Sequence, residues 1–153
     1  MLDAIRGMEY VSWMAKADGD RDVAKEETVR NNHPDIACYH IQQAMEKYIK
    51  AQLISVGEEP DRTHNIRRLL DQVYVSLGEV PPRALSGPAG VLTDYEVAAR
   101  YPGPDYTYED YERGVGAFDA IAASLDAMGL DVPSWDDPPR FLDAQDRPDD
   151  ATL

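Results

Sequence analysis

The sequence predicts an all-α protein, built as an up-and-down four-helix bundle with an additional short helix. Between Ala37 and Glu58, apolar side chains recur every three or four residues, which is typical of an amphipathic helix that packs on a core. Glycine and proline signals separate this segment from its neighbours, and no segment shows the strict alternation of a strand. These observations together favour a helical bundle over a sheet.

The first two helices are predicted at about residues 4–30 and 34–56. Pro34 suits the first turn of the second helix, and Gly57 suits the position that follows its last turn. Polar side chains occupy the other positions of this helix, so we expect one buried face and one polar face. The apolar stripe consists of Cys38, Ile41, Met45, Tyr48, Ile49 and Leu53.

Three further helical segments follow along the chain. The third helix is predicted at residues 65–77, with Thr63 as its N-cap. A short fourth helix is predicted at residues 89–99, because the Gly87-Pro88 pair interrupts the segment that precedes it. The last helix is predicted at residues 107–128 and again carries a single apolar face.

The sequence changes character at residue 130, which sets the predicted domain boundary. Residues 1–129 form the predicted bundle. Residues 130–153 contain four prolines and seven aspartates, a composition that does not support a core of its own. We therefore expect an irregular acidic C-terminal tail, in which Trp135 and the Phe141-Leu142 pair are suited to dock on the bundle or on a neighbour.

The formal net charge is −14, which argues against a general binder of nucleic-acid phosphates but leaves room for a local basic pocket. The single cysteine, Cys38, lies on the apolar stripe and predicts a buried thiol in a reducing compartment. No segment has the apolar length of a membrane span, so we expect a cytoplasmic protein. Metal-ligand spacings and glycine-rich phosphate loops are lacking in the sequence, so no metal or cofactor is predicted.

Four short motifs carry a resemblance to a known family. They are Gln42–Lys47 followed by Lys50-Ala51, then Thr63–Ile66, Leu92–Tyr95 and Ala99–Pro102. In this order and spacing they resemble the HEPN domain, the higher eukaryote and prokaryote nucleotide-binding family, over roughly residues 10–130. The resemblance implies a helical bundle that often forms a homodimer. It also implies nucleotide or RNA binding, and for many members a minimal nucleotidyltransferase partner in a toxin–antitoxin system.

Some members of that family are metal-independent ribonucleases, marked by an arginine that precedes a histidine by four to six intervening residues. That motif places a guanidinium beside an imidazole, so that one stabilises charge and the other moves a proton. The sequence lacks this motif, which argues against a ribonuclease of the usual kind. A ribonuclease that uses other residues stays an alternative. The histidines are His33, His40 and His64, and the positions for the arginine hold Glu26, Glu27 and Thr28, then His33, Pro34 and Asp35, then Gly57, Glu58 and Glu59.

The predicted ligand site combines the second helix with two later corners of the chain. Arg100 precedes Tyr101 and Pro102, where a guanidinium can grip a phosphate, although a salt bridge to a nearby carboxylate is the structural alternative. His64 either reaches the ligand or hydrogen-bonds a backbone carbonyl. In an enzyme, His64 carries the proton and Arg100 stabilises charge. The predicted ligand residues are Gln43, Lys47, His64, Arg100 and Tyr101.

Tyrosines gather near the proline-rich turn. Tyr101, Tyr106 and Tyr108 are hard to place in a core, so they form a predicted dimer or ligand surface, while Tyr111 suits core packing. A non-catalytic dimeric interaction scaffold that uses these tyrosines and the acidic tail is the remaining alternative. Two glycines within the last helix, at positions 114 and 116, predict close helix packing.

Overall fold

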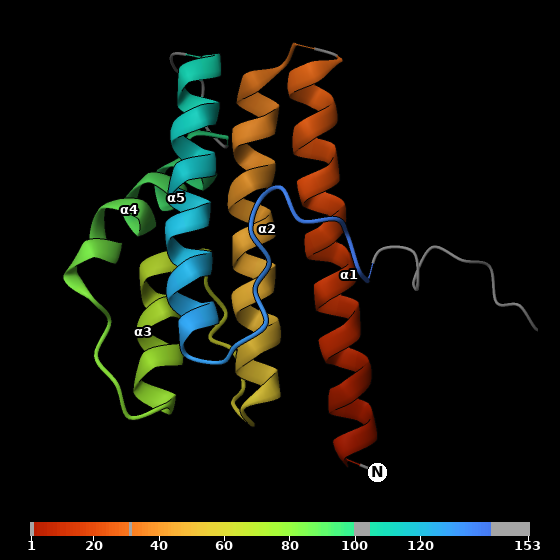
Figure 1. Cartoon of the computed structure of the whole chain (residues 1–153), viewed down its shortest axis with the longest axis vertical. Helices are drawn as coiled ribbons and strands as arrows, with labels where there is room; N and C mark the ends of the chain where they lie inside the picture. The colour runs from red at the N-terminus through yellow and green to blue at the C-terminus, as the bar shows by residue number, and fades with distance from the viewer. Residues whose placement is uncertain (1, 31, 100–104, 142–153) are drawn as a thin grey trace, which may run out of the picture.

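The computed structural model is all-helical and describes residues 2–30, 32–99 and 105–141 (Figure 1). No strand occurs in these ranges, so the predicted all-α class is confirmed. None of the helices within them combines the length and apolar character that a bilayer crossing requires. In chain order, the elements are α1 (Leu2–Val29), α2 (Pro34–Ser55), α3 (Ile66–Ser76), the 3-10 helix η1 (Arg83–Leu85), α4 (Ser86–Ala98) and α5 (Tyr108–Ala127).

The helices lie around α2, with α1 on one side and α3, α4 and α5 on the other (Figure 1). α1 runs antiparallel to α2. Near one end, Asp20 Oδ1 lies 2.8 Å from His40 Nδ1, and towards the other end Gln52 Nε2 lies 3.6 Å from Met14 Sδ. α5 runs in the same direction as α2 (Figure 1).

The loop at residues 56–65 determines where α3 begins. It turns back along α2, so that Gln42 Nε2 donates to the His64 carbonyl oxygen over 3.2 Å. From there α3 runs in the direction of α2, and Gln72 Nε2 donates to the Glu59 carbonyl oxygen over 2.8 Å. In an up-and-down bundle, each helix runs opposite to the one before it. α2 and α3 instead run in the same direction.

Part of the expected polar face of α2 is buried. Gln42 and Glu46 lie on that face, yet they are only 0% and 3% exposed. At these two positions the prediction is wrong, because the returning loop supplies the His64 carbonyl oxygen for Gln42 and the His64 ring for Glu46. On the same face, Lys47 pairs with Asp20 of α1. Helical periodicity identifies the apolar stripe, but it carries no information about which distant segment covers the remaining surface.

Three helices end just before a glycine, as predicted for Gly57. Gly57, Gly78 and Gly129 have φ angles of +88°, +73° and +84°, a conformation that glycine adopts without strain just after a helix. The predicted start of the last helix is also confirmed. Thr107 and Asp110 form a capping box there, in which each side chain contacts the backbone N–H of the other residue.

Two predicted helix starts differ in detail. The N-cap of α3 is Asn65, whose side chain accepts from the Arg68 N–H, while Thr63 Oγ1 accepts from the Asn65 N–H. Pro88 lies within the first turn of α4, where a backbone N–H is not needed. The expected interruption at Gly87-Pro88 is therefore wrong, and α4 begins three residues earlier than predicted.

The chain after α5 packs against the bundle as far as Phe141. Leu130, Val132 and Trp135 are buried in the core, although residues 130–141 form no helix. This segment, the strap, crosses from α5 over α2 to α1 (Figure 1). The predicted boundary at residue 129 thus divides residues that pack together, and the remainder of the predicted tail, residues 142–153, lies outside the described ranges.

The two glycines inside α5 provide a matched pair for a stability test. A Cβ atom at Gly114 would lie 2.7 Å from Tyr95 Cε2 and 3.0 Å from Ile41 Cδ1, whereas one at Gly116 meets nothing within 4 Å. We expect Gly114→Ala to lower the free energy of unfolding by about 1–3 kcal/mol through overpacking. Gly116→Ala should instead raise it by about 0.5–1 kcal/mol through helix propensity. Urea denaturation followed by circular dichroism measures both changes. If both variants change the free energy of unfolding in the same direction, the packing at Gly114 is not as described.

Candidate binding pocket beside the second helix

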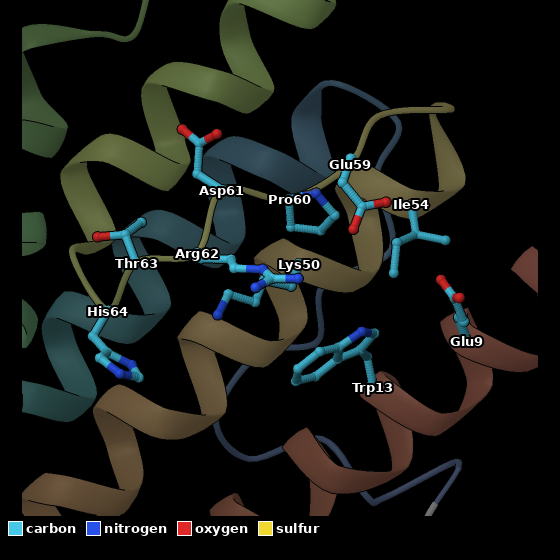
Figure 2. A pocket seen from close by; sticks show the side chains of 10 residues that line it. All are labelled: Glu9, Trp13, Lys50, Ile54, Glu59, Pro60, Asp61, Arg62, Thr63 and His64. Atoms are coloured by element: carbon cyan, nitrogen blue, oxygen red, sulfur yellow. The ribbon is translucent and has the colours of Figure 1, made fainter.

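A pocket of about 360 Å³ lies between α1, α2 and the returning loop (Figure 2). We call it the loop pocket. Its walls combine an indole from α1, an aliphatic and a basic side chain from α2, and the polar residues of the loop. They are Glu9, Trp13, Lys50, Ile54, Glu59, Pro60, Asp61, Arg62, Thr63 and His64.

Glu46, a buried carboxylate of α2, organises one side of the loop pocket. Its Oε1 lies 2.9 Å from His64 Nδ1 and accepts from Gln42 Nε2 over 3.0 Å, while its Oε2 lies 3.1 Å from Lys50 Nζ. A carboxylate only accepts hydrogen bonds, so Nδ1 of a neutral His64 ring carries the proton and Nε2 presents a lone pair. Nε2 has no partner among the described residues, and the His64 side chain is half exposed.

Lys50 and Arg62 bring two cationic side chains to the same pocket. Lys50 is largely buried, and its Nζ lies 5.6 Å from the centre of the Trp13 ring as well as beside Glu46. Arg62 is exposed, and the described part of the chain offers its guanidinium no partner. In Figure 2 the Arg62 side chain extends across the pocket towards Lys50.

Sequence reasoning missed Trp13, Lys50 and Arg62 as site residues. An aromatic residue within an amphipathic helix is normally a core residue, and an arginine in a polar loop is normally solvated. No local signal distinguishes either residue here. They meet because the returning loop runs beside α2 and places residue 62 opposite α1, an arrangement that depends on contacts between distant segments.

Gln43 and Lys47, predicted to hold the ligand, belong to a different part of α2. Lys47 Nζ lies 2.5 Å from Asp20 Oδ2, and His40 Nδ1 contacts the other oxygen of the same carboxylate. Gln43 Nε2 donates to its neighbour Gln42. Neither Gln43 nor Lys47 lines the loop pocket, so of the predicted ligand residues the described structure brings only His64 to it.

Arg100 and Tyr101 lie outside the described residues, so their roles stay predictions. Tyr106 lies against the Tyr95 ring, with 4.7 Å between centroids, and its hydroxyl donates to the Asp94 carbonyl oxygen. Tyr108 is 56% exposed and stacks on Tyr111, whose ring is buried as predicted. A dimer surface at these tyrosines also stays a prediction, and Tyr108 is the described member that presents the most surface.

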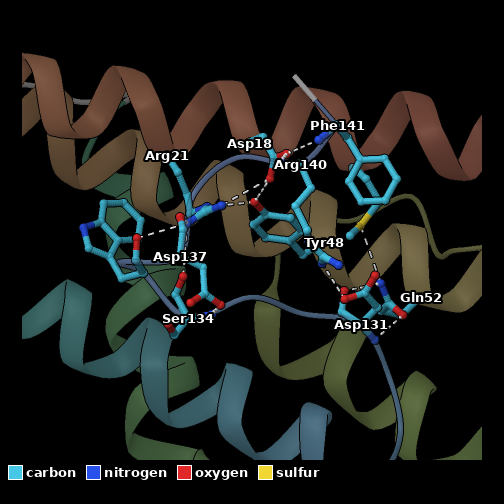
Figure 3. A network of polar contacts seen from close by, with 11 residues as sticks. Asp18, Arg21, Tyr48, Gln52, Asp131, Ser134, Asp137, Arg140 and Phe141 are labelled. Carbon is cyan, nitrogen blue, oxygen red and sulfur yellow. Dashed lines mark hydrogen bonds and ion pairs between the residues drawn. The ribbon is translucent and has the colours of Figure 1, made fainter. Parts of the chain in front are cut away.

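A second polar network joins α1, α2 and the strap (Figure 3). Arg21 donates through Nη1 to the carbonyl oxygens of Ser134, Trp135 and Asp137, and through Nε to the Tyr48 hydroxyl. Asp18 contacts the same guanidinium and accepts from two backbone N–H groups of the strap, those of residues 140 and 141. Burial raises the pKa of the Tyr48 hydroxyl far above its usual value. These groups are mutually satisfied and enclosed, so the network holds the fold together.

Cys38 lies in the core, as predicted, and not in either polar cluster. Its side chain is fully buried, and this burial raises the pKa of the thiol to about 12. A thiol is the weak nucleophile and the thiolate the strong one, so Cys38 is inert in the folded protein. Within the described ranges, no group of three or more potential metal ligands gathers in one place.

These observations define the class of protein: a helical domain with a polar pocket beside its central helix. The HEPN domain family matches residues 10–125, which is most of the chain. The protein belongs to the HEPN domain family, and the resemblance inferred from its motifs is confirmed. This membership relates the chain to nucleotide- and RNA-related functions. Neither a curated protein nor a solved structure showed significant similarity to the chain.

Proposed function

We propose that this chain is a cytoplasmic HEPN module that binds a nucleotide or a short RNA element. The loop pocket carries the proposal, because Lys50, Arg62 and His64 line one cavity of a chain whose net charge is −14. Lys50 and Arg62 offer positive charge and hydrogen-bond donors to an anionic ligand, beside the carboxylates of Glu9, Glu59 and Asp61 in the same cavity. Family membership points to the same chemistry.

The proposal includes a minimal nucleotidyltransferase as the partner in a toxin–antitoxin pair, and a homodimer of the module itself. Tyr108 supports the dimer, since an exposed tyrosine stacked on a buried one offers contact area with little loss of side-chain freedom. The absent Arg-x4-6-His motif supports a binding module rather than a ribonuclease of the usual kind.

A metal-independent ribonuclease is the second candidate, and the contact between His64 and Glu46 favours it. A buried carboxylate that fixes an imidazole leaves Nε2 free to accept a proton from a ribose hydroxyl. The stabilising guanidinium would then come from Arg62 in the loop pocket or from Arg100, as the sequence predicts.

Thermal unfolding with a panel of nucleotides and short RNAs, in the presence of EDTA, tests the proposal. A ligand that binds only the folded state raises the melting temperature, and the shift grows with ligand concentration. We expect His64→Ala to reduce the shift, since it removes one wall of the pocket while Gln42 and Lys50 still pair with Glu46. His33→Ala is the matched control, because His33 is an exposed histidine that also contacts a glutamate.

Gel analysis of the same RNAs separates the two candidates. RNA that remains intact after incubation with the protein supports the binding module. Cleavage that resists EDTA and disappears in His64→Ala would instead support the ribonuclease. A melting temperature that no nucleotide or RNA raises would contradict both.

A further inference from the structure

The loop pocket also indicates the size and charge of its ligand, an inference that rests on the proposed function. We propose that the loop pocket binds a nucleoside monophosphate, with the base against Trp13 and the phosphate between Lys50 and Arg62. Trp13 and Arg62 lie outside the four motifs that carry the family resemblance.

The apolar part of the pocket suits a flat ring. Trp13 projects from α1 and is only partly buried, which leaves indole surface facing the cavity (Figure 2). Ile54 of α2 adds an aliphatic wall and is 4% exposed. Stacking on an aromatic side chain is tolerant of base identity, because every base presents a π face. The pocket is therefore expected to accept purine and pyrimidine rings alike.

The cationic part of the pocket suits one phosphate group. Lys50 is held from behind by the buried Glu46 carboxylate, so its ammonium group is positioned in the absence of any ligand. The Arg62 guanidinium has no carboxylate partner in the described part of the chain and lines the same cavity. A phosphate placed between Lys50 and Arg62 accepts charge-assisted hydrogen bonds from both.

The acidic side chains of the pocket argue for one phosphate rather than three. Glu9 of α1 and the loop residues Glu59 and Asp61 line the same cavity, so additional phosphates would approach carboxylates of like charge. The volume of about 360 Å³ points in the same direction, since it is near the lower end of the range of roughly 300–1,000 Å³ for ligand pockets. A longer polyanion would also meet the net charge of −14 beyond the pocket.

Calorimetry and tryptophan fluorescence on the full chain, with EDTA present, test this inference. Adenosine, guanosine, cytidine and uridine monophosphates are the probes, and adenosine triphosphate, adenosine and inorganic phosphate are the comparisons. We expect the monophosphates to bind more tightly than any comparison and to quench Trp13. Trp135, the other tryptophan, is buried and should not respond. Trp13→Phe should accordingly keep measurable binding in the calorimeter while losing the quenching.

Arg62→Ala should weaken monophosphate binding by roughly tenfold to a hundredfold, the usual effect of losing charge-assisted hydrogen bonds. Arg83→Ala is the matched control, because it removes the same charge from an exposed position in η1 that is not part of the pocket. Circular dichroism before each titration verifies that a variant is folded.

Four outcomes would overturn the inference. Monophosphate binding that is equal in Arg62→Ala and Arg83→Ala would place the ligand elsewhere and leave the proposed function standing. If inorganic phosphate binds as tightly as the monophosphates, the base does not contribute to binding. If adenosine triphosphate binds as tightly, the pocket does not select for one phosphate. If no nucleotide binds in the calorimeter and none raises the melting temperature, the proposed nucleotide binding fails together with this inference.

Discussion

Replacing Arg21 with methionine is expected to lower the free energy of unfolding by about 3–5 kcal/mol. Arg21 is 2% exposed and neutralises Asp18, which is equally buried, while it also donates to three carbonyl oxygens of the strap. Methionine preserves the aliphatic stem and removes the guanidinium. The cost therefore comes from a buried carboxylate that has lost its cation and from carbonyl groups that have lost their donor.

Urea denaturation followed by circular dichroism measures this loss. Arg30→Met is the control, because Arg30 forms an ion pair with Glu26 in which the arginine side chain is 75% exposed. Such surface pairs contribute less than about 1 kcal/mol. If the two variants are destabilised equally, Arg21 does not organise the strap in the way that the contacts indicate.

Trp135→Ala is expected to lower the free energy of unfolding by a similar amount, about 3–5 kcal/mol. The Trp135 ring lies in the core, with its centroid 5.1 Å from that of Phe118, and its indole N–H donates to the Tyr111 hydroxyl over 3.2 Å. Truncation to alanine would leave a cavity against α5 and an unpaired hydroxyl.

Trp135→Phe serves as the control for Trp135→Ala and should recover a large part of the lost stability, because phenylalanine fills most of the space. The same denaturation experiment measures both variants. A cost below about 1 kcal/mol for the alanine variant would mean that the strap does not belong to the folded unit. Arg21→Met combined with Trp135→Ala should cost less than the sum of the single effects, since both variants release the same segment.

Much of the fold was predictable because the relevant signals are local. Pro34 at a helix start and Gly57, Gly78 and Gly129 after helix ends act within one turn of the chain. The apolar stripe of α2 is likewise visible in its own residues. Close packing was predicted for both glycines of α5. It is correct for Gly114, which lets α5 approach Tyr95, and wrong for Gly116, which faces open space. The sequence does not show which of the two glycines faces a neighbouring helix.

The site was predictable only in part, because its residues meet through long-range contacts. His64 is predicted correctly as a corner that faces α2, where it contacts Glu46. Lys47, predicted to hold the ligand, pairs instead with Asp20 of α1. Helical spacing shows which residues share a face, but the choice between solvent, ion pair and pocket depends on the segment that covers that face.

The strap is irregular as predicted, and Trp135 packs on the bundle, one of the two alternatives expected for it. Its composition, rich in proline and aspartate, is that of a segment without a core of its own. Trp135 buries its ring in a core that α2 and α5 already form, and Arg21 supplies the donors that an irregular backbone needs. Arg21, more than one hundred residues away in the sequence, thus donates hydrogen bonds to strap carbonyl groups that a helix would satisfy with its own backbone.

Trp13 and Arg21 project from one continuous helix, separated by about 12 Å along its axis. α1 therefore carries both the indole wall of the loop pocket and the guanidinium that holds the strap. If release of the strap changed the position of α1, it would also displace that wall. Thermodynamic linkage would then require a ligand in the pocket to stabilise the contact with the strap by the same factor.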